Sequence, residues 1–272
     1  MQFSVLLSVY KGENPEWLKQ SINSIYFEQT LKPSEIIMVL DGPLTSELYT
    51  IVSFLKSKIP IIKTIEFEVN RGLGNALYEG LKSCSYEIVA RMDADDIAVS
   101  NRFERQIEYL STHTDVDIVG SFAKNIDFNG NISCDRMVPV SHSQIVSLMW
   151  TCPFIHPSVM FKKSLVLASG SYSKTLKRRQ DYDLWFRCAI KGAHFANIAE
   201  YLLFYRITDD TYKRNSFKVA YNQAKIGFLG FVKLGLGFKA ILGVFYPLLK
   251  SILPLSLRKL VEKTFYKYDP RR

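Results

Sequence analysis

Short apolar runs alternate with helical patterns over the first hundred residues. Residues 3–10 (FSVLLSVY) are rich in Val and Leu, which is typical of a strand buried on both faces. A second such run, residues 35–40 (EIIMVL), stops at the turn signal Asp41-Gly42. Between these two predicted strands, apolar residues recur with the spacing of one helix face, at Trp17, Leu18, Ile22, Ile25 and Tyr26.

The same alternation continues to residue 98 and predicts a parallel sheet. We expect helices near 44–57 and 72–83, and strands near 61–69 and 86–92. Strands alternating with helices of this length imply right-handed crossovers, and ligands of such sheets bind beyond the carboxyl ends of the strands. Four polar residues fall at those ends: Tyr10, Asp41, Asn70 and Asp93.

The alternation loosens after residue 100. A helix is predicted near 100–111, strands at 117–126, 131–138 and 158–161, and a helix at 178–192 that stops at a glycine. We therefore predict one domain at 1–212, with a regularly alternating half at 1–98 and a less regular half at 99–212.

Residues 213–272 have a different pattern, in which apolar clusters alternate with single lysines. The longest uncharged run, 240–249, has ten residues, whereas a bilayer-spanning helix needs roughly 20. We predict a basic amphipathic helical tail that lies in the membrane interface and turns its cations towards anionic head groups. The alternative is a helical hairpin packed on the body with solvated lysines. The cations in question are Lys233, Lys239, Lys250, Arg258 and Lys259.

The charge distribution agrees with this division. The net charge is +9, but residues 213–272 carry 13 Lys/Arg and two acids (+11), so residues 1–212 carry −2. A net acidic body argues against nucleic-acid binding.

Hydrophobic residues are 47% and charged residues 22%, which suits a packed core. The four cysteines form no CxxC pair and no secretion signal is evident at the N-terminus, so a reducing compartment is expected.

The segment ARMDADDIA places Asp93, Asp95 and Asp96 at the end of an apolar strand. Adjacent carboxylates repel, and a divalent cation removes that repulsion. Carboxylates plus phosphate oxygens suit Mg²⁺ or Mn²⁺. In the alternative interpretation, Asp96 caps the next helix and the other two acids are merely exposed.

Six motifs in order resemble the family 2 glycosyltransferases, which are inverting enzymes with the GT-A fold, many of which assemble bacterial O-antigen and capsule. The resemblance covers roughly residues 1–210. The motifs are SVLLSVYKGE, MVLDGP, VNRGLGNALYEGL, ARMDADD, HPSVMF and RRQDYDLWFR. It implies an α/β fold with a Rossmann-like, mostly parallel sheet flanked by helices, followed by a membrane-associating helical segment. By the same resemblance, 1–212 is the GT-A catalytic domain, with 1–98 as its nucleotide-binding half and 99–212 as its acceptor-binding half.

The resemblance also implies roles for individual residues near the nucleotide-sugar. Asp41 is expected to hydrogen-bond uracil, Arg91 to neutralise a phosphate, Asp93 to lie at the ribose or donor sugar, and Asp95 to ligate the metal. Asp93 is a second candidate metal ligand. The other residues expected at the nucleotide are Ser8, Val9, Tyr10, Glu13, Asn70 and Arg71. Two positions depart from the family pattern, since relatives often have Pro at Ser8 and Asn at Lys11.

The last motif implies the catalytic base, which is Asp181. Relatives usually have Glu where this chain has Gln180, so the field around the base differs. Asp183 is interpreted as an acid of the first helical turn. Further residues expected on the acceptor or phosphate side are His156, Arg178, Arg179 and Arg187, with Trp185 either there or in the core beneath.

The predicted reaction is transfer of a hexose or N-acetylhexosamine from a UDP-sugar, with inversion, to a lipid-diphosphate-linked glycan at the cytoplasmic membrane face. The donors UDP-glucose, UDP-galactose and their N-acetyl forms stay open. Two other functions are considered: a sugar-1-phosphate nucleotidyltransferase, and a non-catalytic module that binds nucleotide and membrane. VYKGENPEWL has one glycine, which does not suit a triphosphate-gripping loop, and the two Asp clusters argue against a non-catalytic role.

Overall fold

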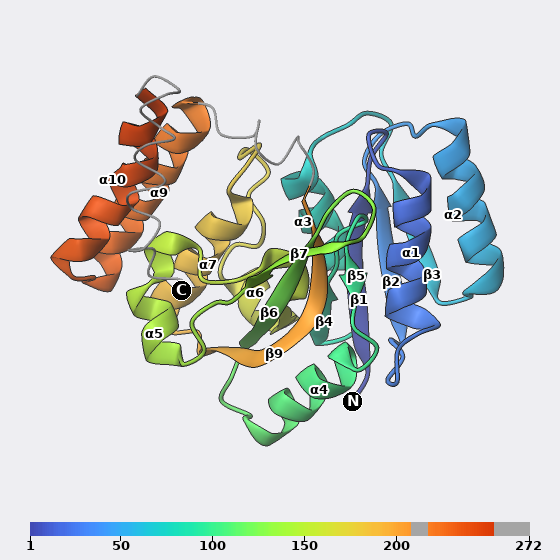
Figure 1. Ribbon diagram of the computed structural model, residues 1–272, viewed down its shortest axis with the longest axis horizontal. Helices are drawn as coiled ribbons and strands as arrows, with labels where there is room; N and C mark the ends of the chain where they lie inside the picture. Colours follow the sequence, from blue (N-terminus) through green and yellow to red (C-terminus); the bar gives the residue numbers. More distant parts are fainter. Residues whose placement is uncertain (208–216, 253–272) are drawn as a thin grey trace.

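A single twisted sheet runs through the centre of the computed structural model, which describes residues 1–207 and 217–252 (Figure 1). The strand order is β3-β2-β1-β4-β8-β6-β9-β5, and β7 pairs with β6 outside this path. The strands are β1 Phe3–Val9, β2 Glu35–Leu40, β3 Ile62–Glu66, β4 Ile88–Arg91, β5 Ile97–Ala98, β6 Ile118–Ile126, β7 Ile132–Arg136, β8 Met160–Lys162 and β9 Phe195–Arg206.

The first four strands of this order are parallel, as the alternating pattern predicted. Beyond β4 the sheet is mixed, because β8 runs antiparallel to both β4 and β6 while β9 runs parallel to β6. The short strand β5 pairs antiparallel with β9, directly after the acidic segment. The second half of the chain thus closes back on the strand end that carries the acids.

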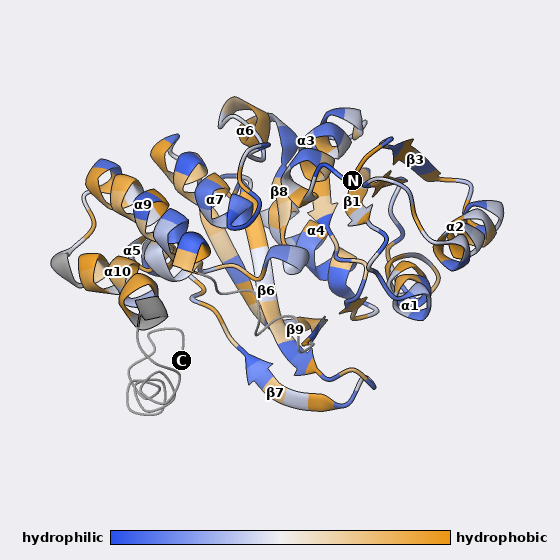
Figure 2. Ribbon diagram, turned by 90° about the horizontal axis from the view of Figure 1, so that it is seen from above, coloured by the Kyte–Doolittle hydropathy of each residue, from blue (hydrophilic) through white to orange (hydrophobic). Residues whose placement is uncertain are grey.

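Helices cover both faces of the sheet, which gives two cores. Val5, Leu7 and Val9 of β1 face α1, α2 and α4, whereas Leu6 faces α3 and α7. Figure 2 shows α3, α6 and α7 along one side of the sheet. The helices are α1 Pro15–Tyr26, α2 Ser46–Lys58, α3 Leu73–Ser83, α4 Arg102–Thr112, α5 His142–Ser147, α6 Lys163–Ala168, α7 Gln180–Ile190, α9 Phe217–Leu234 and α10 Phe238–Ile252.

Local sequence explains where the first two helices begin. The Asn14 side chain accepts hydrogen bonds from the backbone N–H groups of Glu16 and Trp17, and Pro15 occupies the first turn. Thr45 caps α2 in the same way through the N–H of Leu48. The predicted helices and strands are all present within a few residues of their expected bounds. Sequence patterns did not predict β5, α5, α6 or the twelve-residue strand β9.

The helices α9 and α10 form a hairpin at the end of the molecule opposite α1 and α2 (Figures 1 and 2). Glycines allow the close approach of this hairpin to the body. A Cβ on Gly230 of α9 would lie 2.1 Å from the ring of Phe186 on α7, and one on Gly243 of α10 would lie 2.0 Å from Trp150. For residues 217–252, the packed hairpin is therefore the better description of the two alternatives. The predicted boundary at 212/213, Arg258 and Lys259 lie outside the described residues.

We expect Gly230→Ala to loosen this packing and to lower the free energy of unfolding by about 1 kcal/mol or more. The overlap with Phe186 should outweigh the ~1 kcal/mol that alanine gains as the better helix former. Chemical denaturation measures the difference. Gly237→Ala is the matched control, since nothing lies within 4 Å of its added Cβ. Equal losses in the two variants would contradict close packing of α9 on α7.

Candidate active site

The ends of β1 and β2 place the first candidate residues side by side. The backbone N–H of Asp41 donates to the carbonyl of Val9 at 2.8 Å, so Asp41 follows β2 where Tyr10 follows β1. Val9 is buried, Ser8 is partly buried and the Tyr10 side chain is 43% exposed. The Glu13 N–H donates to the Tyr10 carbonyl at 3.0 Å and closes the following turn.

Asp41 organises the neighbouring loop. Its side chain is buried, and its two carboxylate oxygens accept hydrogen bonds from the N–H groups of Arg71 (2.7 Å) and Gly72 (2.9 Å). The Asn70 amide donates to the Asp41 carbonyl at 3.0 Å. Gly42, with φ +87°, allows this contact, because a Cβ there would lie 2.5 Å from the nitrogen of Asn70. Asp41 thus holds Asn70 and Arg71 at the strand ends, and its contact with uracil stays a prediction.

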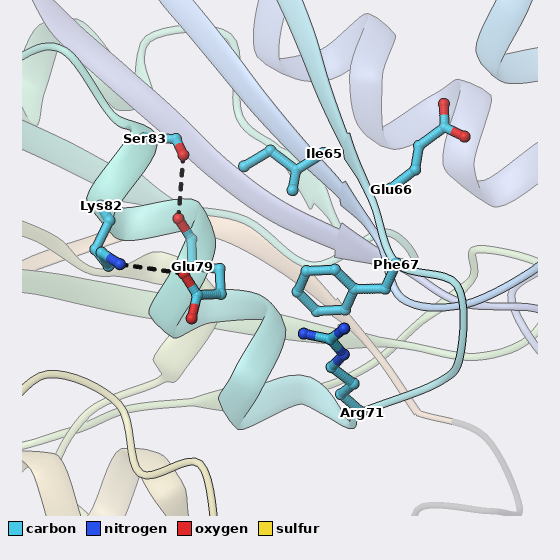
Figure 3. Close-up of a pocket in the computed structure, with 7 residues that line it drawn as sticks. All are labelled: Ile65, Glu66, Phe67, Arg71, Glu79, Lys82 and Ser83. Atoms are coloured by element: carbon cyan, nitrogen blue, oxygen red, sulfur yellow. Dashed lines mark hydrogen bonds and ion pairs between the residues drawn. The ribbon is translucent and has the colours of Figure 1, made fainter.

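A surface groove of about 510 Å³ lies beside this loop, between the end of β3 and α3 (Figure 3). Arg71 lies over the Phe67 ring with its guanidinium carbon 4.7 Å from the centroid. The groove is lined by Ile65, Glu66, Phe67, Arg71, Glu79, Lys82 and Ser83, and none of these belongs to the acidic segment. The strand ends, and not this groove, therefore define the candidate site.

The acidic segment brings three carboxylates together. Asp93, Asp95 and Asp96 each offer an oxygen, and these oxygens all lie within 4.8 Å of one another. Asp93 and Asp95 are partly exposed, whereas Asp96 is 1% exposed. The main chain is anchored from outside, because the Ser21 hydroxyl of α1 donates to the Asp93 carbonyl at 2.8 Å.

Asp96 does not cap a helix, so that part of the alternative is wrong. The next helix, α4, begins at Arg102 with Asn101 at its N-cap. Burial, reinforced by Asp95 and Asp93, raises the pKa of Asp96 well above its usual range. Its Oδ1 accepts the backbone N–H of Arg206 at 2.8 Å, while its buried Oδ2 has no hydrogen-bond partner within the described part of the chain. An all-oxygen cluster with an unpartnered buried oxygen and mutual repulsion fits a hard divalent cation.

Arg91 holds Asp93 from below. The Arg91 side chain is 1% exposed, and its Nη2 pairs with Asp93 Oδ1. A guanidinium that is this deeply buried is hard for a ligand in solvent to reach. The structure therefore favours a role for Arg91 in holding Asp93 over the predicted direct contact with a phosphate. Its Nε and Nη1 have no hydrogen-bond partner among the described residues.

The second half of the site contributes His156, which is partly buried, and Tyr172, which is buried. His156 Nε2 and the Tyr172 hydroxyl are 3.1 Å apart. Burial, and then the charge of Arg91, lower the pKa of His156 well below its usual range, so the ring is neutral at pH 7. Burial raises the pKa of Tyr172; Arg91 lowers it, and Asp181 and Asp93 raise it. Both carboxylates therefore lie within electrostatic range of one buried phenol.

Asp181 lies in the first turn of α7. This helix begins directly after Arg179, which has a left-handed φ of 66°. It is partly exposed, and the Cys152 thiol donates to its Oδ2 at 3.7 Å. Cys152 itself has a positive φ of 60° at the end of a 3-10 turn, Met149–Thr151. The last motif therefore places a partly exposed carboxylate in the first turn of α7.

The other residues predicted on the acceptor side divide into two groups. Trp185 is fully buried against Phe154 and His156, so it supports the site as core and does not line it. Arg187 pairs with Asp183 at 2.8 Å and also donates to the carbonyls of Ser169 and Ser171, which is a structural role. Arg178 is exposed and Arg179 is partly buried, beside Asp181.

Sequence reasoning missed three residues of this region: Tyr172, Cys152 and Arg206. Tyr172 and Cys152 lie in segments without helical or strand periodicity, so no pattern marked them. Arg206 ends β9, and the apolar run FANIAEYLLFYR could have revealed that strand. A buried arginine at the end of an apolar strand is the same signal that marked Arg91.

The mixed sheet with helices on both faces is a GT-A fold. Residues 4–182 match the family model described as "Glycosyl transferase family 2". The chain belongs to this family and is therefore a glycosyltransferase. This finding argues against the two alternative functions, a sugar-1-phosphate nucleotidyltransferase and a non-catalytic module.

Relatives extend the match beyond residue 182. The chain is 34% identical to the amylovoran biosynthesis glycosyltransferase AmsE of Erwinia amylovora, over 97% of this chain and 98% of that one. It is 35% identical to a UDP-Gal:alpha-D-GlcNAc-diphosphoundecaprenol beta-1,3-galactosyltransferase of Escherichia coli, over 78% and 77%. Among solved structures, it resembles the mannosyltransferase PcManGT of Pyrobaculum calidifontis in complex with GDP-Man and Mn²⁺, with TM-score 0.64, 15% identity and coverage of 100% and 82%.

Proposed function

We propose that this chain transfers a hexose or N-acetylhexosamine from a UDP-sugar to a hydroxyl of a polyprenyl-diphosphate-linked glycan, with inversion, in surface polysaccharide biosynthesis. The observation that carries the proposal is the cluster of three carboxylates after β4, Asp93, Asp95 and Asp96, whose oxygens lie within 4.8 Å of one another in a chain that belongs to glycosyltransferase family 2. The Escherichia coli relative, whose name specifies UDP-Gal and a diphosphoundecaprenol acceptor, supports the choice of donor and acceptor class.

The donor nucleotide would lie across the ends of β1 and β2. Ser8, Val9, Tyr10 and Glu13 line one side, and Asp41 with the Asn70–Arg71 loop lines the other. The tight hydrogen bonding of Asp41 to that loop supports this placement, because it orders the loop before ligand arrives. Asp93, held by Arg91, would face the ribose or the donor sugar.

Asp95 and Asp93 would hold Mn²⁺ or Mg²⁺, with Asp96 beside them. When bound, the cation stabilises the negative charge that develops on the departing diphosphate. The fit of the all-oxygen cluster and the Mn²⁺ in the Pyrobaculum structure support metal dependence.

Asp181 would act as general base in a single displacement. Its carboxylate takes the proton of the acceptor hydroxyl as that oxygen forms a bond to the anomeric carbon, and the bond from that carbon to the UDP oxygen breaks. One displacement inverts the anomeric configuration, so an α-linked donor gives a β-linked product. His156 is neutral, so it can orient Tyr172 without adding charge near the base. Arg178 and Arg179 would meet an acceptor phosphate, which the exposure of Arg178 and the partial exposure of Arg179 support.

The experiment is a transfer assay with a panel of UDP-sugars and a synthetic polyprenyl-diphosphate-linked acceptor, with Mn²⁺ or with a chelator. We expect transfer from one UDP-hexose or UDP-N-acetylhexosamine, lost on chelation, with a β-linkage seen by NMR. No transfer or UDP release from any member of the panel would contradict the proposal.

The proposed location is the cytoplasmic face of the bacterial inner membrane, with peripheral association. Among residues 1–207 and 217–252, no helix is both long and apolar enough to cross a membrane. The outward side of the α9–α10 hairpin is nevertheless apolar: Leu229, Val232, Leu242 and Leu249 are 53%, 60%, 63% and 62% exposed. Residues 217–252 contain five lysines and no acid. Exposed apolar area with lysines supports binding to an anionic surface.

We expect the full chain to bind phosphatidylglycerol vesicles, and the double variant Leu229→Glu/Val232→Glu to lose about tenfold or more of that affinity. Sedimentation with the vesicles measures it. Substitution is preferred to truncation because α9 packs on α7. Phe54→Glu on α2, 47% exposed at the other end of the molecule, is the control and should bind like wild type. Equal binding by all three proteins would remove the hairpin from the proposal.

A further inference from the structure

Arg206 is a buried cation that connects four separate segments. It ends β9 and is 3% exposed. Its backbone N–H donates to Asp96 Oδ1 and its Nε donates to the Asp95 carbonyl, both at 2.8 Å. Its Nη1 donates to the carbonyls of Asp127 and Phe128 at 3.1 Å, in the turn between β6 and β7.

The same guanidinium also reaches α1. Its Nη2 donates to Gln20 Oε1 at 3.1 Å, and its plane lies over the Trp17 ring, 4.7 Å from the centroid. Four of the five N–H groups of the guanidinium are thereby used, on three different segments. Trp17 in turn contacts the Phe128 ring edge-on, with centroids 4.8 Å apart, so the α1 and turn contacts support each other.

These contacts restrain the acidic segment where repulsion would otherwise move it. Three neighbouring carboxylates within 4.8 Å favour spreading of the chain when no cation is present. Arg206 restrains the main chain of Asp95 and the side chain of Asp96, while the Ser21 hydroxyl restrains Asp93 through its carbonyl. An ordered set of ligand oxygens loses less entropy on binding a metal ion.

We infer that Arg206 is a positioning residue, whose guanidinium presents the Asp95 carboxylate to the metal–diphosphate by bonding to the Asp95 carbonyl. Its backbone N–H, which the substitutions below retain, holds the Asp96 side chain. The inference rests on the proposed function, and it concerns metal affinity and not the proton transfer at Asp181. Lysine can replace this residue only in part, because one ammonium cannot reproduce the planar fork that bonds to the carbonyls of Asp95, Asp127 and Phe128.

The test is the affinity for Mn²⁺ in the presence of UDP, by titration calorimetry, for wild type, Arg206→Lys and Arg206→Met. We expect Arg206→Met to weaken Mn²⁺ binding by about 10–100-fold, as removal of a residue that orients a metal ligand does, and Arg206→Lys to lie in between. Binding of uridine, which has no phosphate for the metal to bridge, should stay at the wild-type level. A merely structural role would move both readouts together.

Arg105→Met is the matched control. Arg105 also joins a helix to β9, through Glu200 at 2.6 Å, but it is 40% exposed and makes no contact with the acidic segment. It should bind Mn²⁺ like wild type. If Arg206→Met fails to fold, Arg206→Lys decides, since it keeps the charge and most of the buried stem. A folded Arg206 variant with wild-type Mn²⁺ affinity would overturn the inference. If wild type itself binds no Mn²⁺ with UDP, it is the proposed function that fails.

Discussion

Asp181→Asn should keep donor binding and lose sugar transfer by about 10²-fold or more. The amide occupies the same space at the start of α7 but cannot accept the proton of the acceptor hydroxyl. Because the proposal assigns proton transfer to Asp181 and donor binding to the strand ends, the affinity for UDP-sugar should stay near the wild-type value. Initial rates of transfer and calorimetry with the donor measure the two quantities separately.

Asp183→Asn is the matched control for this prediction. Asp183 lies two residues further along α7 and pairs with Arg187 at 2.8 Å, an (i, i+4) contact on the structural side of the helix. The control should lower Tm while leaving the turnover of the folded enzyme close to wild type. Transfer by Asp181→Asn within a few-fold of wild type, or an equal loss in Asp183→Asn, would contradict the assignment of the base.

Asp95→Asn should reduce Mn²⁺-dependent binding of UDP by about tenfold or more. Loss of a residue that only hydrogen-bonds to a metal ligand already lowers metal affinity by about that factor, so loss of a ligand should cost at least as much. The substitution removes one negative charge from a cluster in which the carboxylate oxygens lie within 4.8 Å of one another. The loss should be visible in the calorimetric titration with Mn²⁺ present and should shrink when a chelator is added. Transfer should fall with it, since the leaving diphosphate is less well stabilised.

Asp135→Asn on β7 controls for the loss of a charge. Asp135 is an exposed acid that pairs with Lys124 at 3.7 Å and accepts the Tyr201 hydroxyl at 2.8 Å. We expect no change in its response to Mn²⁺. If Asp95→Asn retained full metal-dependent binding, the cation would have to be held elsewhere.

The candidate site was predictable where it rests on strand ends. The order of apolar runs and turns predicts which residues follow β1, β2 and β4, because parallel strands connected by crossover helices end at the same edge. Asp41 and the Asp93–Asp96 segment could therefore be assigned to one crevice before any contact was known. Residue type then indicated the chemistry, since clustered carboxylates need a cation or a proton.

The contacts that hold these residues in place could not be predicted. Nothing local indicates that Arg91 turns inward to Asp93, or that Asp41 bonds to the loop at Arg71. Both arrangements depend on the register of segments far apart in the chain. The acceptor-side predictions for Trp185 and Arg187 illustrate the same point. Helical spacing placed them on α7, but only packing decided that one faces the core and the other pairs with Asp183.

The amino-acid order of this chain determined by itself the α/β class, the edge of the sheet that carries the acids, and membership of a glycosyltransferase family, because periodicity and motif spacing are local properties. Only the tertiary structure decided that β9 returns to place Arg206 against Asp95 and Asp96, that Tyr172 meets His156, and that α9 packs on α7. The physical reason is that those contacts arise from side chains brought together by the closing of the mixed half of the sheet, and no local pattern encodes which distant partners will meet.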